Sequence, residues 1–156
     1  MKKLIYLCSL FLLMLITGVF WGTWFTLTRS IESFSPGEFI HIGKVIIANV
    51  AAPMRIIMPS CILLVLLSLW LYKQKKTVVF YLGVLSLISI IATLLITVLV
   101  LVPIDNDINE WTTLTVPRDF EEIRHKWKTY HALRTFLSLG SFVCFSLFIP
   151  GNRNKE

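Results

Sequence analysis

VVFYLGVLSLISIIATLLITVLVLV, residues 78–102, is a long apolar run without a single charged side chain. A helix of about 20 such residues crosses the hydrocarbon core of a bilayer, which is about 30 Å thick. The rest of the chain agrees with this stretch: 56% of its residues are hydrophobic, 15% are charged, and its mean hydropathy is +0.76. Soluble domains carry about 25% charged residues. The sequence therefore indicates an integral membrane protein.

Further apolar runs flank this one, so that candidate spans cover residues 4–25, 53–72, 78–102 and 131–150. They predict an all-α membrane protein, with residues 1–156 forming a single domain folded as a four-transmembrane-helix bundle. The first run follows a short basic lead, as in a secretory signal. It is longer than the apolar region of a signal and lacks a small-residue cleavage site, so we expect it to remain as a span.

The basic residues predict the orientation of the bundle. An even number of spans leaves both termini on one side of the membrane. The whole net charge of +6 belongs to that side, which also carries the loop at residues 73–77, whereas the charges on the other side sum to zero. Because basic residues favour the cytoplasm, we expect a multi-pass protein of the cell membrane, in bacteria the inner membrane, with both termini cytoplasmic. No basic stripe indicates a nucleic-acid partner.

Ser35-Pro36-Gly37-Glu38 predicts the start of a helix, because serine before the helix, proline in its first position and glutamate in its third form a capping box. This helix would begin well ahead of the second span. Residues 117–123 repeat the pattern of residues 36–42 at an offset of 81, with proline, an acidic residue, phenylalanine and isoleucine in matching places. The second and fourth helices are therefore expected to extend on the extracytoplasmic side. The repeat could come from duplication of a helical hairpin. It could also arise because both segments use the same residue types to start a helix.

Prolines and hydroxyl groups mark the interior of the spans. Pro53 and Pro59 are expected to kink the second span. The third span carries a stripe of hydroxyl side chains at helical spacing, Ser86, Ser89, Thr93 and Thr97. We interpret this stripe as helix packing rather than as a conduction path. The third span is expected to stop at Pro103, where the short polar side chains of residues 105–107 suit a helix exit and a turn.

Ionisable and amide side chains gather near the outer ends of the spans. Counting about 1.5 Å per residue places Arg55 and Arg134 about 3–5 Å inside the outer boundary of the hydrocarbon core. Asp105, Asn106 and His131 lie at that boundary. On one interpretation the arginines reach the headgroups and pair with nearby aspartates, which pins the bundle. On the other, this layer lines an outward-opening pocket made of Asn49, Arg55, Asp105, Asn106, Trp127, His131 and Arg134.

The pocket hypothesis gives these residues chemical roles. An arginine would bind an acidic or phenolate oxygen, His131 would move a proton near neutral pH, and Trp127 would cover an aromatic ring. His131 and Arg134 are the candidate catalytic residues; the candidate ligand-binding residues are Asn49, Arg55, Asp105, Asn106 and Trp127. No histidine pair has the spacing of a metal site, and no glycine-rich cofactor loop is present, so neither a metal nor a cofactor is expected.

Several of these stretches resemble the anthrone-oxygenase-like family of small four-span membrane proteins. The family is marked by a Pro-x-Asn turn after the third span and by Trp-x3-His-x2-Arg leading into the fourth. Here VPIDNDINEW contains Pro103 and Asn106, and RHKWKTYHALRTFLSL contains Trp127, His131 and Arg134. The turn departs from the pattern by one position, because Asp105 stands where the family has asparagine. GVFWGTWFTLTRSI and Asn49-x3-Pro53-Met54 extend the resemblance to the first half.

The resemblance implies a reaction that oxygenates anthrones to anthraquinones, in which an electron-rich carbanion itself reacts with oxygen. Such an enzyme needs a base and oxyanion stabilisation more than a cofactor, and His131 with Arg55 or Arg134 could supply both. We expect the protein to bind an amphipathic aromatic or lipid-like ligand at its outer polar layer. The alternative is a non-catalytic structural or accessory membrane subunit. Besides the lipid bilayer, the partner could be a second copy of the chain or another membrane subunit.

Overall fold

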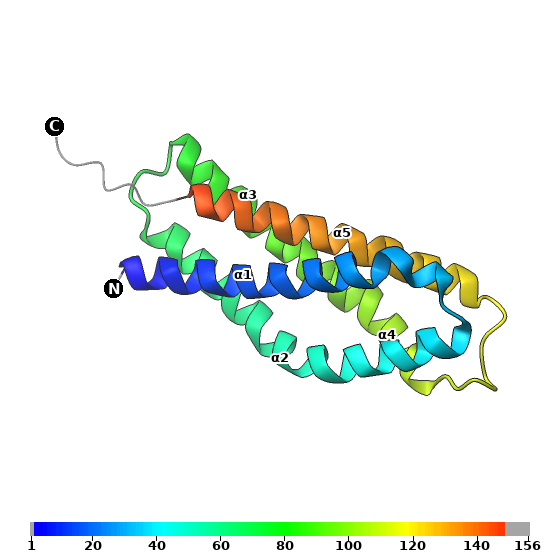
Figure 1. Ribbon diagram of the computed structural model, residues 1–156. Coiled ribbons are helices and arrows are strands. Elements are labelled where there is room, and N and C mark those ends of the chain that lie inside the picture. Colours follow the sequence, from blue (N-terminus) through cyan, green and yellow to red (C-terminus); the bar gives the residue numbers. More distant parts are fainter. Residues whose placement is uncertain (1, 149–156) are drawn as a thin grey trace.

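The computed structural model describes residues 2–148, and over that range the chain folds into helices joined by short connections (Figure 1). The α-helices are α1 (Lys2–Thr26), α2 (Pro36–Leu71), α3 (Val78–Ile96), α4 (Val102–Glu110) and α5 (Phe120–Leu147). A 3-10 segment, η1 (Thr28–Ser33), follows α1, and a π-helical segment, η2 (Thr97–Leu101), joins α3 to α4. No strand occurs among the described residues, which confirms the all-α prediction.

Three helical stretches are long and apolar enough to cross a membrane: Lys2–Ser33, Pro36–Leu71 and Val78–Glu110. Within residues 2–148, α5 is not among them; its first half is charged, and His131 and Arg134 precede its apolar second half. The chain is thus a helical membrane protein. The fourth span at 131–150 stays a prediction, and its last residues, like the basic residues near the C-terminus, lie outside the described range.

The connections fall at two opposite ends of the bundle. In Figure 1 the α1–α2 and α4–α5 connections lie at one end, whereas the N-terminus, the α2–α3 connection and the end of α5 lie at the other. Hydroxyl pairs hold the helices together between these ends: Ser86 and Ser141 are 3.0 Å apart, and Ser9 and Ser68 are 3.1 Å apart. Ser86 belongs to the hydroxyl stripe of α3 and packs against α5, whereas Thr93 and Thr97 of that stripe donate to carbonyl groups one turn earlier in their own helical run.

Helix α2 begins and bends as its sequence predicts. The Ser35 hydroxyl accepts a hydrogen bond from the Glu38 backbone N–H at 3.4 Å, and the Glu38 carboxylate accepts from the Ser35 backbone N–H at 2.8 Å. Pro53 and Pro59 lie inside the helix, and Figure 1 shows α2 changing direction near its middle. The matching pattern before α5 differs, because that helix begins at Phe120 and has no side-chain cap.

The predicted helix exit at Pro103 is wrong. The chain widens into the π-helical turn of η2 and then continues as α4 to Glu110. Pro103 falls in the first turn of α4, where its missing N–H and fixed φ are tolerated. The polar residues that were expected in a turn therefore project from a helix, and this changes which of them face the same way.

Two apolar clusters form the core. One lies in the half that contains the N-terminus and is built around Leu13, Ile16, Cys61, Ile90 and Phe145. The other lies at the end with the α1–α2 and α4–α5 connections and is built around Ile31, Phe39, Leu101, Ile108 and Trp127. The space between the two clusters, on the inner side of the bend in α2, is incompletely filled.

Candidate functional site

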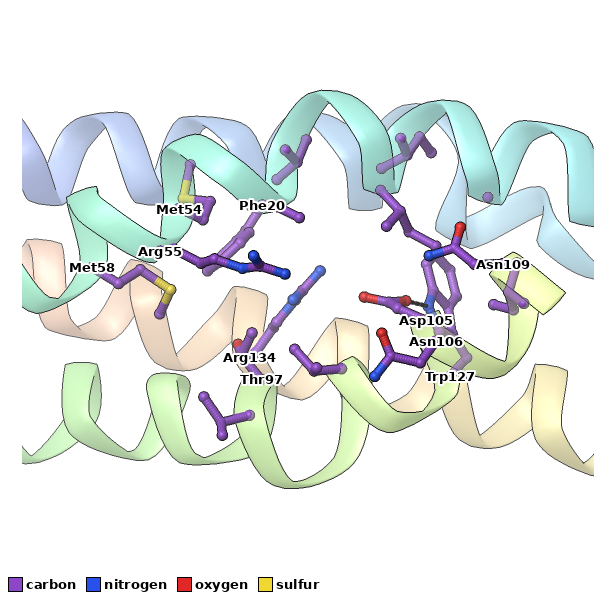
Figure 2. Close-up of a pocket in the computed structure, with 18 of the residues that line it drawn as sticks. Phe20, Met54, Arg55, Met58, Thr97, Asp105, Asn106, Asn109, Trp127 and Arg134 are labelled. Carbon is purple, nitrogen blue, oxygen red and sulfur yellow. Dashed lines mark hydrogen bonds between the residues drawn. The ribbon is translucent and has the colours of Figure 1, made fainter.

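A cavity of about 400 Å³ lies between the two apolar clusters (Figure 2). Its walls come mainly from α2, η2, α4 and α5, with Phe20 contributed by α1, Ile31 by η1 and Leu94 by α3. The bend of α2 at its two prolines moves this helix away from η2 and α4, which leaves the space. Most of the lining is aliphatic or aromatic; the polar side chains among it are Arg55, Thr97, Asp105, Asn106, Asn109, Trp127 and Arg134.

Arg134 is the central charge of the cavity. Its guanidinium carbon lies 4.4 Å from the centroid of the Phe20 ring, which holds the side chain by a cation–π contact. Its Nε atom is buried and has no hydrogen-bond partner among the described residues. Figure 2 shows the guanidinium groups of Arg134 and Arg55 reaching toward one another in the cavity. The site thus gathers positive charge that the described residues do not neutralise through an ion pair.

Asp105 faces the same cavity from α4. One of its carboxylate oxygens accepts a hydrogen bond of 3.1 Å from the indole Nε1 of Trp127. Trp127 is only 5% exposed, and its ring packs edge-on to Phe39 at 6.0 Å and tilted against His131 at 4.8 Å between ring centroids. The indole therefore fixes one oxygen of Asp105 in place.

His131 and Asn49 do not line this cavity, contrary to the prediction. The His131 side chain is 1% exposed, and its Nδ1 lies 3.5 Å from the Thr28 hydroxyl, on the side of α5 that packs against η1. Its ring contacts the Trp127 ring, which lines the site. Asn49 is exposed, because it lies on another side of α2. The side that faces the cavity carries Gly43 and Val50.

The structure adds residues that the sequence reasoning missed. Thr97 and Asn109 line the cavity, and Asn109 follows Asp105 by four positions on α4. That i, i+4 spacing would have revealed the shared face if residues 102–110 had been interpreted as helix. Arg124 is also buried: it donates to the Phe34 carbonyl at 2.8 Å and pairs with Glu121, so it ties the start of α5 to the connection before α2.

No group of three or more histidine, cysteine or acidic side chains within the described range could hold a metal ion. The site's own groups can instead bind an anion through Arg134 and Arg55, accept a proton at Asp105, and cover a ring with Trp127. That the protein uses no cofactor stays a prediction.

Comparisons with known proteins bear on the part of the chain that supplies most of the cavity lining. No curated protein and no solved structure matches the chain. A family model described as anthrone oxygenase matches residues 48–144, which is more than half of the chain. The match includes Arg55, Asp105, Trp127 and Arg134. The chain therefore belongs to the anthrone oxygenase family.

Proposed function

We propose that the protein is a four-span bundle of the cell membrane with both termini in the cytoplasm and with α2 and α5 extending on the outer side. The distribution of side chains on α5 supports its role as the fourth span. Its hydroxyls at Thr135, Ser138 and Ser141 are buried against other helices, whereas its outward positions carry apolar side chains such as Phe136 and Val143. A helix of this kind presents a lipid-compatible surface despite its modest mean hydropathy.

The rim of the cavity supports entry of a ligand from the bilayer. Val98 and Val102, on η2 and α4, are exposed beside the cavity, and Arg55 and Asn106 are exposed next to them. An amphipathic molecule in the outer leaflet would first contact the apolar side chains at the rim. Its polar end would then lie at the same depth in the membrane as the polar groups of the site. The opening thus fits a lipid-like or aromatic amphiphile better than a small hydrophilic solute.

One observation carries the assignment of the ligand: Arg134 stands against Phe20 in an apolar cavity without an ion-pair partner among the described residues. A cation held away from water is costly unless an anion joins it. An acidic or phenolate oxygen of the ligand would be that anion, and the volume of about 400 Å³ lies in the range of about 300–1,000 Å³ that small-molecule sites occupy.

The family name suggests the chemistry. A hydroxyanthrone that loses a proton from its ring CH₂ becomes an electron-rich anion, dioxygen adds at that carbon, and loss of water leaves the quinone. Arg134 would hold the phenolate oxygen, and Asp105, whose other oxygen is fixed by Trp127, would accept the proton. Asp105 takes the role first assigned to His131, because His131 does not reach the cavity.

A structural subunit is the competing function. It would use the same polar residues to pair with one another and pin the helices. None of the described ion pairs involves Arg55, Asp105 or Arg134, which favours a ligand site.

Equilibrium binding of a hydroxyanthraquinone, followed by quenching of tryptophan fluorescence in bilayer nanodiscs, tests the proposal. Loss of a hydrogen bond to a charged group corresponds to about 1.5–3 kcal/mol, so Arg134→Gln should weaken binding about 10-fold to 100-fold. Arg118→Gln is the matched control, because Arg118 is an exposed cation at the same end of the bundle. Equal affinity of wild type and Arg134→Gln would remove the basis of the proposal.

Dioxygen uptake with a hydroxyanthrone, corrected for its spontaneous oxidation, tests the chemical step. Asp105→Asn should lower the rate while binding of the quinone persists. If dioxygen uptake with the protein is no faster than spontaneous oxidation, the protein binds the ligand but does not catalyse this reaction.

A further inference from the structure

A second binding feature lies along the seam between α1 and α5, away from the cavity. The seam is closed by hydrogen bonds, from the Thr17 hydroxyl to the Ser138 carbonyl at 3.1 Å and from the Thr135 hydroxyl to the Phe20 carbonyl at 3.4 Å. Two hollows lie above it. The inner hollow, of about 270 Å³, is lined by Met14, Thr17, Gly18, Trp21, Leu139 and Phe142. None of these residues lines the cavity around Arg134.

The inner hollow is shaped for an aliphatic chain. Apart from Thr17, whose hydroxyl is used in the seam, its lining is apolar. A methyl group added at Gly18 would meet no atom within 4 Å, so the position is open. The hollow therefore offers apolar surface that nothing among the described residues covers.

The outer hollow, of about 450 Å³, is positively charged. Arg29, His125 and Lys128 contribute to its lining, together with Trp24 and threonine side chains. Glu32 balances part of this charge, because its carboxylate lies 2.7 Å from the Lys128 amine and 3.5 Å from His125 Nδ1. Arg29 lies over the Trp24 ring at 5.7 Å and has no carboxylate partner among the described residues. The hollow thus keeps an uncompensated cation.

Aromatic rings stand between the two hollows. Trp24 lies 5.0 Å from Phe136 and 5.2 Å from Trp21 between ring centroids. Trp21 and Phe136 are exposed on the outside of the bundle. Tryptophan is enriched where hydrocarbon meets headgroups, so the cluster indicates the level of that boundary. The charged hollow then falls at headgroup level and the apolar hollow at the level of the acyl chains.

We propose that this groove binds a phospholipid with an anionic headgroup. The phosphate contacts Arg29 and Lys128, the glycerol region crosses the tryptophans, and one acyl chain lies beside Gly18. From Lys128 to Leu139 the groove follows α5 for about 16 Å at 1.5 Å per residue. One leaflet with its headgroups is about 20 Å thick, so a single lipid spans both hollows. Free phosphate would leave the apolar hollow unused.

Native mass spectrometry tests this with the full chain released from nanodiscs that contain equal amounts of phosphatidylglycerol and phosphatidylcholine with identical acyl chains. Wild type should retain phosphatidylglycerol preferentially. Each of Arg29→Gln and Lys128→Gln should lower that preference about fivefold, the effect of removing one charge near a membrane surface. Gly18→Leu should lower retention of both lipids, because its side chain fills the inner hollow.

Arg118→Gln is the control, since this exposed cation lies outside both the groove and the cavity. The proposal is overturned if wild type shows no headgroup preference, or if the control loses it as Arg29→Gln does. Unchanged retention in Gly18→Leu would overturn it as well, because the site would then recognise only phosphate.

Discussion

Replacing Trp127 with phenylalanine removes one hydrogen-bond donor and leaves an aromatic ring between Phe39 and His131. The lost donor is the indole Nε1–H, which bonds to an Asp105 oxygen at 3.1 Å. The bond joins α5 to α4 across the wall of the cavity. Its loss should loosen that wall and free the carboxylate.

The magnitude follows from the charge of the acceptor. Hydrogen bonds between membrane helices contribute about 0.6 kcal/mol on average. A bond to a charged group contributes about 1.5–3 kcal/mol. Because Asp105 is a carboxylate that also faces Arg134 across the cavity, we expect a coupling of about 1.5 kcal/mol between positions 105 and 127, or about tenfold in the unfolding equilibrium.

A double-mutant cycle measures this coupling. The variants are Trp127→Phe, Asp105→Ala and their combination, unfolded with denaturant in detergent and followed by circular dichroism. Trp111→Phe replaces Trp127→Phe in the control cycle, because the Trp111 ring packs on Phe120 and makes no described side-chain hydrogen bond. A coupling below about 0.5 kcal/mol, or one equal to that of the control cycle, would show that this hydrogen bond does not couple α4 to α5.

Two further predictions concern packing and pH. Gly83→Ala should destabilise the folded protein by about 1–3 kcal/mol, because its new methyl would lie 2.7 Å from a Leu69 methyl. Gly18→Ala should be nearly neutral, because a methyl at that position would meet no atom within 4 Å. Thermal unfolding in detergent compares the two variants. Hydrogen bonds from Ser35 lower the pKa of the Glu38 carboxyl from its usual 4.5, so its stabilisation is complete above pH 4.5 and is lost as the pH falls through the lowered pKa. Glu38→Gln should therefore be less stable than wild type at neutral pH and equally stable in acid; a difference that persists in acid would contradict the capping role.

Local features of the sequence predict the local structure well. Ser35 and Glu38 lie next to the backbone groups they cap, so the start of α2 follows from three positions. The apolar runs likewise predict the helices, because their length and lack of charge are properties of the segments themselves. Arg55, Asp105 and Arg134 could be placed near one level by counting residues, and all of them line the cavity.

Features that depend on contacts between helices were not predictable in this way. Whether Pro103 ends a helix depends on the π-helical turn before it, and nothing in residues 97–101 signals that turn on its own. His131 lies on the helix that carries Arg134, yet its direction is set by Thr28 and the packing of η1. The open space itself depends on how far the bend carries α2 from α4.

The proposed function requires Arg134 to contact an acidic oxygen of the ligand, and a cycle between ligand and protein tests this contact directly. Calorimetry would compare a hydroxyanthraquinone with its O-methyl ether, each titrated into wild type and Arg134→Gln in nanodiscs. Wild type should bind the free phenol at least about tenfold more tightly than the ether, and Arg134→Gln should bind the two alike. The same preference for the phenol in Arg134→Gln as in wild type would contradict the proposed contact.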